Sequence, residues 1–321
     1  MATLKEELVS LDILKPLPID VVLIIGEYAD SWILFMGGHD GSSPQTRVLR
    51  YSIANRQWLT LNPMPVAQCR AKAIVRGDSV FVMGGVTAGA RAENQVLCYS
   101  LARNTWQTDE KFCEMSDCRW DAVIASTTDG VVVCGGVGSD WVPKQRSCQV
   151  FDFAVRTWTK FAELVFPRVA ACGVRWKNSL YVFGGGDPAE AASSGEKYDS
   201  DLKSWSLIAP LPRPCFSGCA VTVPHLGILL MGGADPHNRR LSNNVHLYKS
   251  DLNRWQNMPW DLPIPLQNFT AHYLDGIVYV CGGFSNGRQV AACWSLDLGA
   301  PEWLSLPSLP RPLSGMASVA V

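Results

Sequence analysis

The chain has 321 residues, with 28 Lys and Arg against 29 Asp and Glu, which gives a formal net charge of −1. A chain this close to neutrality has no global basic field, so we do not expect it to bind nucleic acid or an anionic membrane surface. No apolar run reaches the roughly 18 residues that a transmembrane helix needs. The first residues show no basic segment followed by an apolar one, so we expect no secretion signal and a cytoplasmic or nuclear protein.

The first segment in chain order, residues 1–30, carries no copy of the repeat that fills the rest of the chain. Leu17-Pro18-Ile19-Asp20 leads into aliphatic pairs and Tyr28, which predicts a short helical segment with Pro18 in its first turn. This pattern resembles the opening helix of an F-box. The resemblance implies a ligase subunit of the Skp1 or cullin type as a partner. The alternative is an amphipathic segment that only packs its apolar side against the following domain.

Residues 31–321 hold six copies of one pattern. Each copy is a short apolar run, two glycines, a loop, an aromatic residue and then a tryptophan. The glycine pairs are Gly37-Gly38, Gly84-Gly85, Gly135-Gly136, Gly184-Gly185, Gly232-Gly233 and Gly282-Gly283. The tryptophans are Trp58, Trp106, Trp158, Trp205, Trp255 and Trp303. We assign both sets to structure, the tryptophans filling space between repeats and the glycines allowing close backbone approach.

The second copy shows the four strands expected in each unit. They are Ala71–Val75, Ser79–Met83, Gln95–Tyr99 and Thr105–Thr108. The second strands are apolar almost throughout, which indicates cover on both faces by neighbouring sheets. Four strands at a fixed period of 47 to 51 residues are typical of the blades of a β-propeller.

The glycine pair followed by an aromatic and a tryptophan with six residues between them resembles the kelch repeat. The resemblance covers roughly residues 31–321 and implies an all-β, six-bladed kelch propeller. Phe151 stands for the usual Tyr in the third copy. In the sixth copy we take Trp294 as the aromatic, nine residues before Trp303, with two extra residues between them.

The two ends of the repeat region predict how the ring closes. The first copy begins directly at a second strand, Trp32–Met36, with no first strand before it. Residues 314–321 resemble the first strand of the other copies. We therefore expect the C-terminal strand to pair beside Trp32–Met36 and to close the ring, which removes the open sheet edges.

The 11 cysteines indicate neither a disulfide framework nor a metal site. Many fall within predicted strands, where free Cys behaves as a small apolar residue. Neither Cys113 with Cys118 nor Cys215 with Cys219 has a second pair of Cys or His to complete a zinc site. We expect reduced thiols, no metal and no cofactor.

Strand connectivity divides the connections between two faces of the ring. We call the face with the loops from strand two to three and from strand four to the next blade the loop rim, and the opposite face the turn rim. Loops that vary on a rigid scaffold are where binding usually occurs. The candidate partner-binding residues on the loop rim are Arg70, Arg119, Arg168, Arg213, Arg311, Trp141, Arg146, Arg239, Arg240 and Arg288.

The resemblance to kelch adaptors implies that arginines in these loops hold carboxylates of a partner. Arg70, Arg119 and Arg168 match that position by their place before a first strand. The alternative is that these arginines bind backbone carbonyls or pair with Asp in a neighbouring blade. Trp141 lies in a polar loop and is either an exposed anchor for a partner or a cover over a blade edge.

We therefore expect a non-catalytic module that binds an acidic peptide or protein on the loop rim, plausibly as the substrate-recognition subunit of a ubiquitin ligase. The alternatives are a cytoskeletal or signalling scaffold and, less favoured, a carbohydrate-active kelch enzyme. No Ser-His-Asp arrangement, zinc-protease motif or phosphate-binding glycine loop can be defended from residue spacing.

Overall fold

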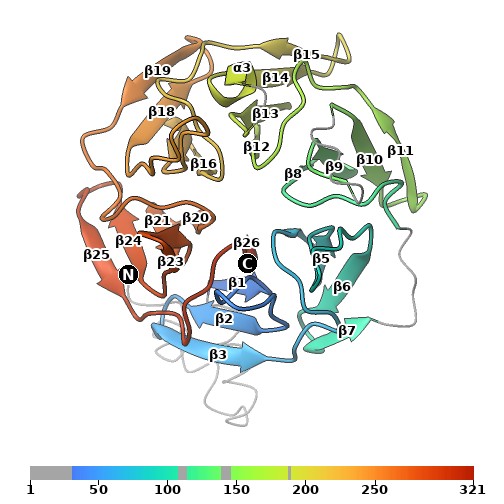
Figure 1. Cartoon of the computed structure of the whole chain (residues 1–321), viewed down its shortest axis with the longest axis vertical. Helices are drawn as coiled ribbons and strands as arrows, with labels where there is room; N and C mark the ends of the chain where they lie inside the picture. Colours follow the sequence, from blue (N-terminus) through green and yellow to red (C-terminus); the bar gives the residue numbers. More distant parts are fainter. Residues whose placement is uncertain (1–30, 108–113, 139–145, 187–188) are drawn as a thin grey trace, which may run out of the picture.

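A computed structural model describes residues 31–107, 114–138, 146–186 and 189–321. The expectations for residues 1–30 and for Trp141 fall outside these ranges. The described chain is a ring of six antiparallel four-stranded sheets around a central axis (Figure 1). The innermost strands of neighbouring blades contact one another around the whole ring, so the predicted six-bladed kelch propeller is confirmed.

The blades follow one another in chain order, and each runs from an innermost to an outermost strand. Blade 1 contains β26 (Ala317–Ala320), β1 (Trp32–Met36), β2 (Val48–Ser52) and β3 (Gln57–Leu61). Blade 2 contains β4 (Lys72–Arg76), β5 (Ser79–Met83), β6 (Val96–Ser100) and β7 (Thr105–Gln107). Blade 3 contains β8 (Val123–Ser126), β9 (Gly130–Cys134), β10 (Cys148–Asp152) and β11 (Thr157–Phe161).

Of the remaining three blades, blades 4 and 6 carry additional short elements on the loop rim. Blade 4 contains β12 (Cys172–Trp176), β13 (Ser179–Phe183), α3 (Ala189–Ala192), β14 (Gly195–Asp199) and β15 (Ser204–Leu207). Blade 5 contains β16 (Cys219–Val223), β17 (Gly227–Met231), β18 (Val245–Lys249) and β19 (Arg254–Asn257). Blade 6 contains β20 (Thr270–Leu274), β21 (Ile277–Cys281), the hairpin β22 (Phe284–Ser285) and β23 (Arg288–Gln289), β24 (Cys293–Asp297) and β25 (Trp303–Leu306).

The glycine pairs connect each blade to the next. The N–H of Gly85 donates a hydrogen bond of 2.8 Å to the carbonyl of Arg119, which lies four residues before β8. Gly84 has φ +63°, and a Cβ there would overlap the same carbonyl oxygen. A residue with a side chain cannot take this place without displacing the neighbouring blade. The second glycine makes the same bond in every blade, with Gln68, Arg119, Arg168, Cys215, Leu266 and Leu313 as acceptors.

The repeat tryptophans bridge the outer edges of neighbouring blades. Trp106 lies directly opposite Tyr99 in the sheet, with ring centroids 5.0 Å apart. Its Nε1 donates to the carbonyl of Asn62 in the preceding blade at 3.1 Å. Trp58, Trp205 and Trp255 donate to the preceding blade in the same way.

The sixth copy keeps the spacing of the other five, and our interpretation of Trp294 was wrong. Leu296, not Trp294, lies opposite Trp303, in the register that Tyr99 has with Trp106. Trp294 lies opposite Val280 and is buried in an apolar cluster with it. A leucine therefore replaces the aromatic in blade 6, and no residue is inserted.

The C-terminal strand closes the ring as predicted. β26 pairs with β1 from Met36 opposite Ala317 to Ile33 opposite Ala320. Two hydrogen bonds between Trp32 and Val321, of 3.0 and 2.9 Å, extend the ladder. Blade 1 is thus built from both ends of the described chain, and the inner edge of β1 is paired.

Candidate functional site

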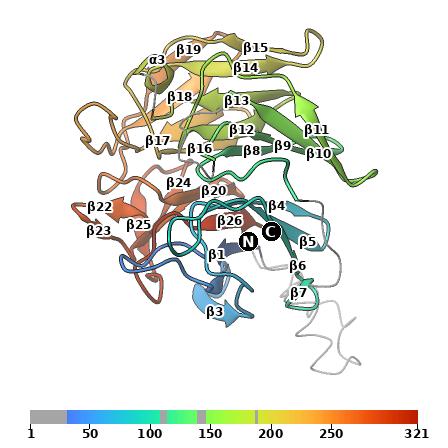
Figure 2. The same cartoon turned by 45° about the vertical axis from the view of Figure 1, so that its right-hand side comes forward.

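The loop rim carries the longer connections of the propeller. The segment with α3 joins β13 to β14, and the β22–β23 hairpin joins β21 to β24. Figure 2 shows both on the same side of the ring. All the candidate arginines lie in connections on this side, so their depth decides which of them a partner could reach.

A closed ring of backbone hydrogen bonds surrounds the axis at the loop rim. Each blade contributes the residue that lies two positions before the first residue of its innermost strand, as Arg70 does before Lys72 of β4. In order around the ring these residues are Arg70, Asp121, Ala170, Ser217, Asn268 and Gly315, and all have positive φ between 52° and 61°. The N–H of each donates to the carbonyl of its predecessor at 2.7 to 3.3 Å, and Arg70 donates to Gly315.

This ring leaves little space at the axis. The cavity that the six residues line has a volume of only about 30 Å³, which is room for about one or two water molecules. The mouth of the channel on the loop rim is therefore too small to admit a side chain of another protein, and only the surrounding loops are open to contact.

Arg70 belongs to this ring and pairs with an acid of the next blade. Its guanidinium donates to Asp121 Oδ2 at 2.6 Å and lies 5.0 Å from the centroid of Trp120. The carboxylate of Asp121 raises the pKa of the Arg70 guanidinium. The side chain of Arg70 is 38% exposed and that of Asp121 is 6% exposed. Arg70 thus adopts the inter-blade pairing that was the alternative to partner contact, although it stays partly accessible.

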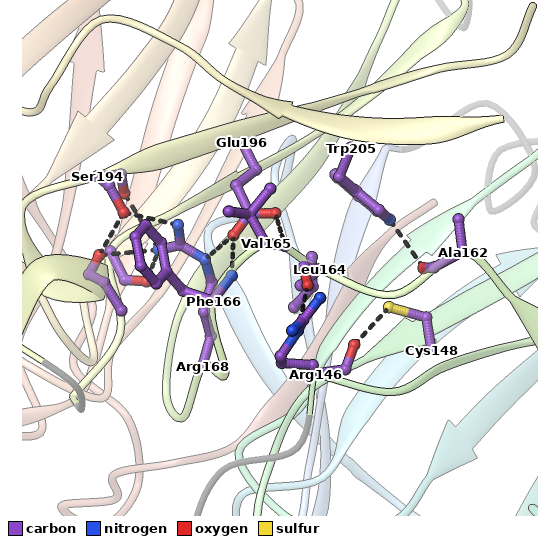
Figure 3. Close-up of polar contacts among 12 residues, drawn as sticks. Arg146, Cys148, Ala162, Leu164, Val165, Phe166, Arg168, Ser194, Glu196 and Trp205 are labelled. Carbon is purple, nitrogen blue, oxygen red and sulfur yellow. Dashed lines mark hydrogen bonds and ion pairs between the residues drawn. The ribbon is translucent and has the colours of Figure 1, made fainter. Parts of the chain in front are cut away.

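Arg168 lies four residues before its innermost strand, and Figure 3 shows its polar contacts. Its Nε donates to Glu196 Oε1 at 2.8 Å, and both side chains are 0% exposed. Its other nitrogens donate to the carbonyls of Gly184, Ala191 and Ser194 and to the hydroxyl of Ser194. Burial lowers the pKa of Arg168, and the charge of Glu196 opposes that effect.

Arg119 has the same place in blade 3. Its guanidinium donates to the carbonyls of Gly135 and Ser147 at 2.9 and 2.8 Å, to the hydroxyl of Ser147, and to Asp117 at 3.1 Å. The side chain is 1% exposed. The prediction that Arg119 and Arg168 bind a partner is therefore wrong, because their guanidinium groups are buried and bind backbone carbonyls within their own blades.

Two further candidates are partly engaged within the chain. Arg213 donates to the side-chain oxygen of Asn244 at 3.1 Å. Arg146 donates through Nε to the carbonyl of Leu164 at 2.8 Å and lies 3.9 Å from Glu163, with both side chains largely exposed.

Four candidates are exposed and form no ion pair with an acidic side chain among the described residues. They are Arg239 and Arg240 in the β17–β18 loop, Arg288 in β23, and Arg311 between β25 and β26. Within the described ranges, none of these four side chains forms an ion pair or a hydrogen bond. The nearby Asp235 accepts from groups of its own loop, the N–H of His237 and the side chain of Asn238. We call these four arginines the basic sector of blades 5 and 6.

Glu196 and Asp121, the acids that pair with Arg168 and Arg70, were not among the site residues predicted from the sequence. Glu196 also accepts from the N–H groups of Val165 and Phe166, at 2.7 and 3.1 Å, so it fixes the loop that leads into β12. The sequence signal for Glu196 was an acidic residue in the third strand of blade 4, at the position where blades 1 and 2 have Leu49 and Leu97. For Asp121, the signal was its position two residues before β8.

Two negative findings apply to the described residues. They contain no group of three or more His, Cys, Asp or Glu placed to hold a metal ion. They also contain no helix long and apolar enough to cross a membrane.

The fold and the repeat together define a six-bladed propeller of the kelch type. Residues 32–293 match the family described as "Attractin/LZTR1 beta-propeller", and the chain belongs to that family. It is 24% identical to rat Kelch-like protein 36 over 278 residues, which are 82% of this chain and 44% of the relative. It is also 24% identical to mouse Kelch-like protein 35 over 308 residues, which are 94% of this chain and 48% of the relative.

The chain spans less than half the length of these curated relatives. A solved structure titled "Structure of YjhT" superimposes with a TM-score of 0.70 at 14% identity and covers 85% of this chain and 97% of that one. At that identity the likeness concerns the fold alone.

Proposed function

We propose that this propeller is a protein-interaction module whose basic sector binds an acidic segment of a partner protein. The observation that carries the proposal is the group of four exposed guanidinium groups without carboxylate partners on the loop rim of blades 5 and 6. Guanidinium groups bind carboxylates through two parallel hydrogen bonds, and arginine is enriched at interface hot spots. The kelch-like relatives support an interaction role for the propeller.

A charge-reversal variant tests the site. Arg239, Arg240, Arg288 and Arg311 are replaced by Glu, and binding of fluorescein-labelled peptides of acidic, neutral and basic sequence is followed by anisotropy. We expect the native chain to prefer the acidic peptide, more strongly at low salt, and the variant to lose that preference.

The control variant carries the same change in net charge on the turn rim. Arg56, Arg103, Lys203 and Arg254 are all exposed there, and all four are replaced by Glu. Equal losses in the two variants would show only a general charge effect and would overturn the assignment to the loop rim.

A narrower proposal is that the module selects substrates for a ubiquitin ligase, with a Skp1- or cullin-type subunit as second partner. The F-box-like pattern at residues 17–28 supports it. Affinity purification of the full chain beside a chain without residues 1–30 tests it, because only the full chain should retain ligase subunits. Partners that both chains retain equally would support the alternative, a scaffold propeller.

A further inference from the structure

The six seams between neighbouring blades follow one packing rule on the turn rim. The residue at the end of each innermost strand, or directly after it, faces a residue of the next blade. That residue lies two positions after the kelch aromatic, or after Leu296, which replaces the aromatic in blade 6. Arg76 of blade 2, for example, lies over the ring of Phe153 in blade 3, 4.5 Å from its centroid. In the seam from blade 4 to blade 5, Trp176 donates to the hydroxyl of Ser250 at 3.0 Å.

Three other seams are filled by apolar side chains. The pairs Val321 with Leu101, Val223 with Leu298, and Leu274 with Ile53 each belong to one apolar cluster. Five of the six seams therefore contain at least one large side chain at this position.

The seam from blade 3 to blade 4 departs from the rule. The two positions hold Thr127 and Ser200, both small and polar, and among the described residues no other seam has such a pair. A pocket of about 350 Å³ lies there, with Thr127, Ser200, Phe161, Leu180, Tyr198 and Arg175 among its walls. The small side chains at these two positions contribute to this pocket, because they leave unfilled the space that larger side chains take in the other seams.

The absence of bulk also uncovers the kelch aromatic of blade 4. Tyr51, Tyr99 and Tyr248 are 1% exposed, whereas Tyr198 is half-buried and faces Phe161, with ring centroids 4.5 Å apart. The hydroxyls of Tyr99 and Tyr248 donate to Asn104 and Asn253, five residues further on. Blade 4 has Lys203 at that position, and within the described ranges the hydroxyl of Tyr198 has no hydrogen-bond partner.

Arg175 supplies the one positive charge among the residues that line the pocket. It donates to the hydroxyl of Thr128 at 3.2 Å and forms no ion pair with a described residue. Asp199, next to Ser200 in the chain, accepts from the backbone of Asp201 and Leu202 instead. Arg175 also lines a cavity of about 360 Å³ in the axial channel, so it borders both spaces.

We propose that the seam pocket between blades 3 and 4 binds small carboxylates with a compact apolar body. The carboxylate pairs with Arg175, and the apolar body lies between Phe161, Leu180 and Tyr198. The volume falls within the range of small-molecule sites, and the mixture of apolar walls with a few polar groups is typical of them. The site is on the turn rim, so it is independent of the proposed interaction at the basic sector.

Ligand-observed NMR titration of the full chain with 3-phenylpropionate and 4-methylpentanoate tests the proposal. The neutral amide of each acid serves as a matched probe. We expect at least one acid to bind with a dissociation constant of about 1 mM or tighter. We expect its amide to bind about tenfold more weakly, because it loses the charge-assisted bond.

Two variants locate the binding. Ser200→Leu introduces the residue that blades 2 and 6 carry at this position, Leu101 and Leu298, and should abolish binding of both acid and amide. Arg175→Gln should remove the preference for the acid and leave amide binding unchanged. Ser206→Leu and Arg254→Gln make the same chemical changes at exposed positions outside the pocket and should bind as the native chain does.

Three results would overturn the proposal. They are the absence of saturable binding by either acid, equal affinity for acid and amide in the native chain, and binding that survives Ser200→Leu. Far-ultraviolet circular dichroism and the melting temperature show that each variant is folded. If Ser200→Leu fails to fold, the acid preference of Arg175→Gln decides the question.

Discussion

Blades 3 and 4 each bury an arginine four residues before the innermost strand, but they surround it with different partners. In blade 4 the Nε of Arg168 donates to Glu196. In blade 3 the place of Glu196 is taken by Gln149, which lies opposite Val133 as Glu196 lies opposite Val182. Among the described residues, Arg119 Nε and Gln149 Nε2 are both buried without a hydrogen-bond partner.

The orientation of the Gln149 amide explains this difference. Its oxygen accepts from the N–H and the hydroxyl of Ser116, at 3.0 and 2.9 Å. The amide nitrogen of Gln149 then points toward Arg119. Both this nitrogen and the Nε of Arg119 are donors, so neither can accept a hydrogen bond from the other. A carboxylate has two accepting oxygens and can serve both sides, as Glu196 does. Backbone carbonyls therefore hold the arginine in both blades, and the acid is a further, separable contribution.

The largest effect is expected for Arg168→Met. The substitution leaves Glu196 buried and without its cation, so we expect the free energy of unfolding to fall by about 3–5 kcal/mol. Urea denaturation measures it. Adding Glu196→Leu should recover only part of the loss, because the N–H groups of Val165 and Phe166 then lack their acceptor. A loss below about 1 kcal/mol for the single substitution would contradict the buried pair.

Arg119→Met should cost less, about 1–3 kcal/mol, because it leaves no buried charge. The carbonyl of Gly135 loses its donor, whereas the carbonyl of Ser147 still accepts from the N–H of Gly135. The carboxylate of Asp117, which pairs with Arg119, is 55% exposed, so water can hydrate it after the substitution. The same denaturation experiment compares the two variants directly. An equal loss in both would mean that the carbonyls, and not Glu196, account for the effect in blade 4.

The sequence was sufficient to predict the ring but not the depth of these arginines. The glycine pairs and tryptophans recur because every seam needs them, and the strands predicted for blade 2 agree with the structure within one residue. Arg70 and Arg119 differ by two positions relative to their strands, which is enough to move a guanidinium from the channel mouth into a blade. Strand starts read from sequence are uncertain by about that much. Glu196 is 28 residues from Arg168, so no local pattern marks the pair.

Exchanging the two partners provides a test of opposite sign. Gln149→Glu gives Arg119 an acceptor while keeping the bonds from Ser116, so we expect stabilisation by about 1 kcal/mol. Glu196→Gln should destabilise by more than this, because the buried guanidinium of Arg168 loses its counter-charge and keeps only its carbonyl and hydroxyl acceptors. Melting temperatures of the two variants and of the double exchange measure this. A destabilising Gln149→Glu would show that blade 3 cannot accommodate a second charge.

The smallest effect is expected at the channel mouth, for Arg70→Gln. The pair with Asp121 is short, but Arg70 is 38% exposed, and ion pairs open to solvent contribute about 1 kcal/mol or less. The ring of backbone hydrogen bonds does not involve the side chain and should persist. Asp121 is 6% exposed, so the small loss in the free energy of unfolding should come from leaving its carboxylate without a cation. That loss should be smaller in high salt. Denaturation at low and high sodium chloride tests this, and a loss near that of Arg168→Met, unchanged by salt, would place Arg70 with the buried arginines.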